Sequence, residues 1–176
     1  MPATITLDDL AAMISADPHG RRYELSPEGV LSVVPPPESG HAMIATDLTL
    51  WLGRAGWTGE TLMQAPGVRI PGAAGTGGRI PDIALWSRPQ PRDAVWLPVD
   101  DLMLVVEIVT PNSAATDQVT KVTEYAGAGI PQYWTVARDT AQTVTLYRLG
   151  PAGNYEVEAK LPLAWLLQTA PADHVG

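Results

Sequence analysis

Glu107 is the first residue whose surroundings suggest chemistry. It lies in the segment LMLVVEIVTP, residues 102–111, within an otherwise apolar run. The run is short, rich in Val and Ile and closed by a proline, which predicts a central strand covered on both faces. An ionised carboxylate without a partner costs on the order of several kcal/mol in such a strand. Glu107 must therefore reach solvent at the strand end, for example beside Arg79, or have a partner such as a metal cation.

A second acid, Asp82, lies in the apolar segment IPDIALW, residues 80–86. If this segment is a strand that neighbours the one with Glu107, the two carboxylates share one face or one edge and repel each other. A divalent cation between them removes that repulsion. Mg²⁺ binds a few carboxylate oxygens, keeps several waters and supports phosphoryl chemistry. The alternative is a solvated, inert acid at a turn or strand start after a proline.

The segment TDQVTKVTEYAGAG, residues 116–129, adds a cation. On a helix, Asp117, Lys121 and Tyr125 fall at i, i+4 and i+8 and share a face. Because this helix follows the strand with Glu107, it can pack back over the sheet and direct the Lys121 ammonium toward the acids. There the ammonium could orient a water or stabilise charge on a phosphate under attack. The alternative is an ordinary Asp117–Lys121 surface pair worth about 0.3 kcal/mol.

Composition limits the classes of protein to which the chain can belong. It has 176 residues, 45% of them hydrophobic, enough for one globular domain with a sizeable core. It has no cysteines, which excludes disulfides and thiolate metal sites. No apolar run approaches the ~20 residues of a membrane span, and the N-terminus lacks the basic residues of a signal peptide, so we expect a cytoplasmic protein. The net charge of −8 disfavours a protein that binds nucleic acid over a wide surface, but it is compatible with a carboxylate site that binds a cation.

The rest of the sequence predicts the elements that must position these three side chains. Residues 4–16 predict a helix with a capping box from Thr6 to Asp9. A β-hairpin with its turn near Gly29 and a second helix, with apolar residues at a helical period, are predicted next. The glycine-rich segment 71–78 predicts a flexible hairpin connection near the site. The other predicted strands span 58–63, 67–70, 79–86, 102–109, 131–137, 143–149 and 154–161, and the helices 41–54 and 116–127. Together they predict an α/β fold with a mixed sheet.

These motifs, in this order, resemble a known family. The dipeptide PD at Pro81-Asp82, then LVVEIVTPNS around Glu107, then DQVTKVTEYAGAGIPQYWTV are similar to the Uma-two family of restriction endonucleases, within the PD-(D/E)XK nuclease superfamily. The earlier YELSPEG and the histidine at the second helix also match. The similarity runs from about Tyr23 to Leu149, and the block 105–136 is its most specific part.

The resemblance implies a restriction endonuclease-like core with a mixed β-sheet flanked by helices. It implies a single domain over residues 1–176, with its core at about 41–137. An N-terminal helix and hairpin at 4–34 and C-terminal strands at 142–160 would surround this core.

The resemblance also assigns roles to residues. Asp82 and Glu107 would ligate Mg²⁺ or Mn²⁺, and Lys121 would be the catalytic lysine. The superfamily lysine stands two residues after the second acid, where this chain has Val109; in the family it has moved to the following helix. A further departure is Thr110, where the family usually has serine.

Two more candidate catalytic residues, Glu24 and His41, match family positions without a defined role. The alternatives are that Glu24 pairs with Arg21 or Arg22 and that His41 packs locally at the start of its helix.

The leading functional hypothesis is a Mg²⁺-dependent endonuclease that hydrolyses phosphodiester bonds in DNA. A second hypothesis is a non-catalytic binding or regulatory module with the nuclease fold, supported by the acidic composition. A third is an enzyme that uses the same metal site on another phosphate ester. Edge strands and the segment VWLP, residues 95–98, predict an exposed surface and a homodimer.

Overall fold

The computed structural model describes residues 4–110 and 115–176, with side chains in the second range from residue 118 onward. Its helices are α1 (Leu7–Ala16), α2 (Ser39–Gly53), α3 (Ala115–Gly127) and α4 (Leu163–Leu166), followed by the 3-10 turn η1 (Pro171–Asp173). Two features of the sequence analysis lie outside the described part: residues 111–113, PNS, which end the family motif around Glu107, and the side chain of Asp117. Within the described part, no helix has the length and apolar character needed to cross a bilayer.

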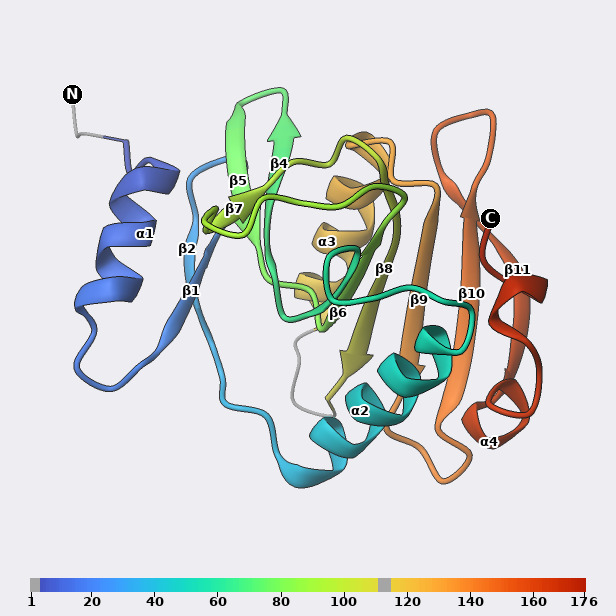
Figure 1. Ribbon diagram of the computed structural model, residues 1–176. Coiled ribbons are helices and arrows are strands. Elements are labelled where there is room, and N and C mark those ends of the chain that lie inside the picture. Colours follow the sequence, from blue (N-terminus) through green and yellow to red (C-terminus); the bar gives the residue numbers. More distant parts are fainter. Residues whose placement is uncertain (1–3, 111–114) are drawn as a thin grey trace.

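The strands form two sheets, each with one parallel pair (Figure 1). Sheet A has the order β2 (Leu31–Val34), β1 (Arg22–Leu25), β5 (Gly75–Arg79), β4 (Gly67–Gly72), β7 (Trp96–Leu97). Sheet B has the order β11 (Tyr155–Pro162), β10 (Thr143–Leu149), β9 (Gln132–Ala137), β8 (Leu102–Val109), β6 (Ile83–Trp86), β3 (Leu62–Gln64). The predicted α/β class with mixed strand pairing is confirmed. The strands are divided between two sheets, however, and do not form a single one.

Strand β8 is the central strand that the apolar run predicts. It pairs with β6 on one side and with β9 on the other. Because side chains alternate along a strand, Leu104, Val106 and Ile108 point to the face that α2 covers. Val105 points to the opposite face, where it shares a buried cluster with Tyr125 of α3. Figure 1 shows α3 on this side of the sheet. Glu107 has the parity of Val105, so its side chain is directed toward α3.

The predicted helices form for the expected local reasons. In α1, the Asp9 N–H donates to Thr6 Oγ1 at 3.1 Å and the Thr6 N–H donates to Asp9 Oδ2 at 2.8 Å, which completes the capping box. In α2, the apolar stripe is buried against sheet B: Ile44, Leu48, Trp51 and Leu52. Burial of this stripe fixes the orientation of α2 and hence the direction of its first turn.

The prediction of one strand over residues 79–86 was wrong. Strand β5 ends at Arg79 in sheet A, and β6 begins at Ile83 in sheet B. Residues 80–82 therefore carry the chain from one sheet to the other, and Pro81 has no N–H to donate to a ladder. Asp82 is a residue of this crossing and not of a strand. Periodicity could not reveal the break, because Ile80 in the crossing is as apolar as the residues of β6 that follow it.

Two local predictions also need correction. The glycine-rich segment is a hairpin as predicted, but Gly75–Arg79 is strand β5, and its turn lies at the opposite end of the molecule from the C-terminal end of β8 (Figure 1). A Cβ on Gly77 would lie 2.5 Å from the Leu25 carbonyl oxygen, so glycine is required for close packing there. The predicted exposure of VWLP was wrong for Trp96 and Leu97, which are buried.

Candidate active site

All five residues that the sequence singled out line one cleft of about 610 Å³. Glu24 comes from β1 of sheet A, Glu107 from β8 of sheet B, and Asp82 from the crossing between the sheets. His41 lies in the first turn of α2, and Lys121 lies on α3. The cleft thus collects side chains from both sheets and from two helices.

The Asp82 carboxylate is fixed on both oxygens. The Ile108 N–H donates to Oδ2 at 2.6 Å, which holds the carboxylate beside the backbone that carries Glu107. His41 Nε2 lies 2.9 Å from Oδ1. The hydrogen bond to Asp82 raises the pKa of His41, although burial opposes it. His41 is therefore directed into the cleft, toward Asp82, which is not the local packing considered as its alternative.

The Glu107 carboxylate is nearly enclosed, with 14% of its side chain exposed. Tyr125 donates its hydroxyl to Glu107 Oε1 at 2.7 Å, and Lys121 Nζ lies 3.5 Å from the same oxygen. Burial raises the pKa of Glu107 to about 7. Lys121 lowers this pKa, whereas the negative charges of Asp82 and Glu24 raise it further. Among the described residues, no ion pair joins Glu107 to Arg79.

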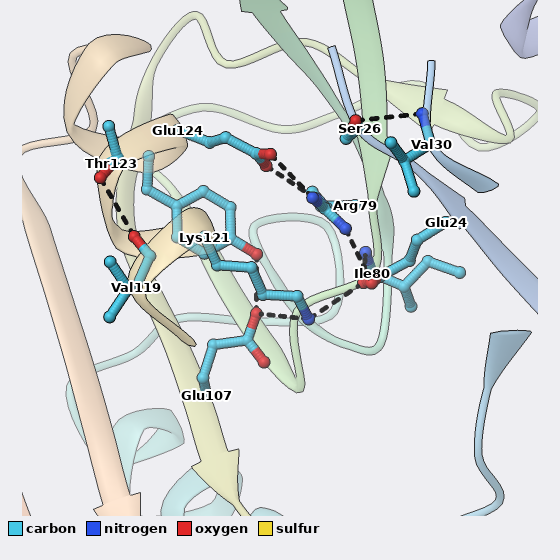
Figure 2. Close-up of polar contacts among 11 residues, drawn as sticks. Glu24, Ser26, Val30, Arg79, Ile80, Glu107, Val119, Lys121, Thr123 and Glu124 are labelled. Atoms are coloured by element: carbon cyan, nitrogen blue, oxygen red, sulfur yellow. Dashed lines mark hydrogen bonds and ion pairs between the residues drawn. The ribbon is translucent and has the colours of Figure 1, made fainter. Parts of the chain in front are cut away.

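Lys121 lies between two carboxylates (Figure 2). Its Nζ is 3.3 Å from Glu24 Oε1 and 3.5 Å from Glu107 Oε1. The shared helix face of Lys121 and Tyr125 is confirmed, since both side chains contact Glu107. Whether Asp117 pairs with Lys121 lies outside the described side chains.

Behind this lysine is a buried arginine that the sequence interpretation gave no site role. Arg79 is 3% exposed, and it contacts Glu24 and Glu124 (Figure 2). Glu24 does not take the partners considered for it, since Arg21 pairs with Asp17 and Arg22 donates to the Ala65 carbonyl. One sequence signal could have pointed to this buried contact. Glu124 stands three residues after Lys121 and hence on nearly the same helix face, so it was a candidate partner for a basic residue near the site.

The carboxylates suit a hard divalent cation that keeps part of its water shell. No group of three or more His, Cys, Asp or Glu side chains among the described residues is arranged around a metal position. Asp82 and Glu107 supply carboxylate oxygens to one cleft, and burial raises the pKa of Glu107 although Lys121 lies beside it. Mg²⁺ is commonly bound by one or two carboxylates plus waters, so these residues fit it.

Comparison with known proteins agrees with the fold. One similar solved structure is "a putative nuclease belonging to DUF820" from Anabaena variabilis ATCC 29413, with a TM-score of 0.62 and 22% identity. The similarity covers 87% of this chain and 83% of that one, and at this identity it shows the fold. No curated protein matches the chain. A family profile, Uma2, described as "Putative restriction endonuclease", matches residues 7–172. The chain therefore belongs to the Uma2 family, as the motifs predict.

Proposed function

We propose that this protein is a metal-dependent endonuclease that hydrolyses phosphodiester bonds in DNA. The observation that carries the proposal is the convergence of Asp82, Glu107 and Lys121 on one cleft, in which the Glu107 carboxylate is nearly buried. Membership in a family described as restriction endonucleases supports the reaction class.

Asp82 and Glu107 are the proposed ligands of Mg²⁺ or Mn²⁺. When bound, such a cation supplies positive charge to a phosphate and lowers the pKa of a coordinated water. The chain's own contribution is to hold the two carboxylates in one cleft. The Ile108 N–H and His41 orient Asp82, and Tyr125 orients Glu107. Hydrogen-bonded partners of this kind keep ligands in place and typically change metal affinity by about 10- to 100-fold when removed.

Lys121 is the proposed catalytic cation. Its ammonium enters the cleft from α3, beside Glu107, where it can stabilise charge that develops on phosphate oxygens and orient the attacking water. Since the chain has a net charge of −8, substrate phosphate is repelled at long range. Positive charge inside the cleft, from Lys121 and a bound cation, offsets this repulsion where the reaction takes place.

A non-catalytic module with the same fold is the second candidate. It is favoured by the position of Lys121 between Glu24 and Glu107, because two carboxylates there compensate its charge without a metal. Absence of metal binding at millimolar concentration, together with absence of cleavage of any nucleic acid, would select this candidate.

The proposal extends to the domain organisation, the cellular location and the oligomeric state of the protein. The residues 1–176 form one nuclease domain with its core at about 41–137, the protein acts in the cytoplasm, and it forms a homodimer. The edge strands β2 and β11 support the last point, since Val33 and Val157 on them are each 54% exposed.

The test is cleavage of supercoiled plasmid DNA and of single-stranded DNA with Mg²⁺, Mn²⁺ or a chelator. We expect cleavage by the wild type with either metal and none with the chelator. Asp82→Asn and Glu107→Gln should each lower the rate by at least about 10²-fold, because each removes a ligand charge. Glu28→Gln, an exposed acid on the β1–β2 hairpin, is the matched control. Wild-type rates in both site variants, with a folded protein, would refute the assignment.

A further inference from the structure

Glu24 is a buried carboxylate whose two oxygens are both engaged. Oε1 accepts the Ile80 N–H at 2.8 Å and lies 3.3 Å from Lys121 Nζ, and Oε2 lies 3.3 Å from Arg79 Nη1. The residue is 5% exposed. A carboxylate held by a backbone N–H and two cations in the interior has little freedom to rotate. Glu24 therefore presents a fixed acceptor to Lys121.

Arg79 fixes the other side of the same group. Its Nε and Nη2 each donate to an oxygen of Glu124 at 2.7 Å (Figure 2). This bidentate, two-bond contact fixes the plane of the guanidinium group. Glu124 is three residues after Lys121 on α3. The contacts from Glu24 through Arg79 to Glu124 thus join β1, β5 and the helical turn that carries Lys121.

The lysine itself needs such an anchor because of where it stands in the chain. A lysine two residues after Glu107 would be placed by the same strand as its acid, but that position is Val109. Lys121 reaches the cleft from a helix, on a side chain with four rotatable bonds. Glu107 also contacts the ammonium, but at the longer distance, 3.5 Å against 3.3 Å for Glu24.

We propose that Glu24 is the positioning residue for Lys121: it holds the ammonium in the cleft when the charge of Glu107 is engaged elsewhere. The inference rests on the proposed function, in which Glu107 ligates a cation and Lys121 acts on the substrate. Glu24 acts through Lys121 and is not itself a metal ligand. The backing by Arg79 and Glu124 makes the contact rigid, and sheet A thereby positions a catalytic group beside Glu107 of sheet B.

The first test observes the lysine directly, without metal or DNA. The chain has two lysines, Lys121 and Lys160, so protein labelled with ¹³C at lysine Cε gives two side-chain signals, and the exposed Lys160 is an internal reference. A fixed lysine shows two separate Hε frequencies. We expect this splitting for Lys121 in the wild type, in Glu107→Gln and in the control Glu28→Gln, and its loss in Glu24→Gln. Splitting that is lost in Glu107→Gln and retained in Glu24→Gln would overturn the proposal.

The second test separates positioning from metal ligation. Glu24→Gln should lower kcat by about 10²-fold, with the half-saturating Mg²⁺ concentration within about 2-fold of wild type, because the metal ligands are intact. In a Lys121→Met background the same change should cost less than about 3-fold, since its effect passes through the lysine. An equal loss in both backgrounds, or a Mg²⁺ requirement raised more than about 10-fold at unchanged kcat, would contradict positioning.

Two provisions keep the tests decisive. If Glu24→Gln does not unfold cooperatively, and so is not properly folded, Glu24→Asp takes its place. Its shorter side chain keeps the negative charge but moves it away from Lys121, so both the splitting and kcat should fall. Wild-type splitting and kcat in a folded Glu24→Asp would overturn the proposal. If the wild type cleaves no nucleic acid, the proposed function fails, but the lysine spectra still decide whether Glu24 holds Lys121.

Discussion

At the scale of single residues, burial sets the chemistry of Glu107. The unfolded chain ionises this carboxyl at its ordinary pKa of 4.5, whereas burial raises the pKa to about 7 in the folded protein. Folding therefore takes up a proton between these pH values, and the free energy of unfolding falls as the pH rises through them. The same burial makes a cation beside the ionised Glu107 carboxylate favourable.

This sign predicts how Glu107→Gln changes the pH dependence of stability. Below about pH 4.5 the carboxyl is neutral in both states, and above about pH 7 the folded protein bears the full cost of the buried charge. In metal-free buffer, the free energy of unfolding of Glu107→Gln relative to wild type should rise by up to about 3 kcal/mol from pH 4.5 to pH 8. Urea unfolding at several pH values measures it.

The control for that series is Glu28→Gln, which removes an exposed carboxyl. Its stability profile should remain parallel to that of the wild type. A parallel profile for Glu107→Gln as well would show that Glu107 keeps an ordinary pKa and that its charge is fully compensated without metal.

At the scale of elements, Arg79 holds sheet A to α3. It is buried between Glu24 of β1 and Glu124 of α3, so its removal takes the cation away from the buried Glu124 carboxylate and leaves Glu24 with Lys121. We expect Arg79→Met to lower the free energy of unfolding by about 3–5 kcal/mol. Arg79→Lys should also destabilise the protein, because an ammonium cannot form the two-bond contact with Glu124. Denaturant unfolding checks both.

Arg69→Met is the matched control, since Arg69 lies on the neighbouring strand β4 and is exposed. Its effect should stay within about 0.5 kcal/mol. Equal effects at Arg69 and Arg79 would mean that the buried contacts contribute nothing to the attachment of α3.

The elements also show what the sequence can and cannot predict. Local signals identified the capping box of α1, the buried stripe of α2 and the central strand β8, because each depends on residues close in sequence. The division of residues 79–86 between two sheets depends on which distant strands pair, as Arg79 with Val68 and Ile83 with Val106. No periodicity records such pairing.

The same distinction applies to the site. The motif resemblance brought Asp82, Glu107 and Lys121 together, and the structure places them on one cleft. The contact of Arg79 with Glu24 and Glu124 spans 55 and 45 residues, so it could not be inferred without the fold. Likewise, the direction of His41 toward Asp82 depends on how α2 packs on sheet B.

At the scale of the whole molecule, the net charge and the position of the cleft make a bound cation necessary for nuclease activity. Nineteen acids against eleven Lys and Arg residues give a net charge of −8, which repels a polyanion. The cleft where the two sheets meet gathers the carboxylates of Glu24, Asp82 and Glu107, and the negative charges of Asp82 and Glu24 help to raise the pKa of Glu107 although Lys121 lowers it. A nuclease built in this way depends on a bound cation for both affinity and chemistry, so we predict that Asp82 and Glu107 bind a divalent metal ion.

Isothermal calorimetry with Mn²⁺ at pH 8 tests that claim most directly. We predict saturable binding by the wild type, weaker binding at pH 6 because the raised pKa of Glu107 favours its protonated form there, and loss of binding in Asp82→Asn and in Glu107→Gln. Binding that is unchanged in both variants, or absent from the folded wild type at millimolar Mn²⁺, would contradict it.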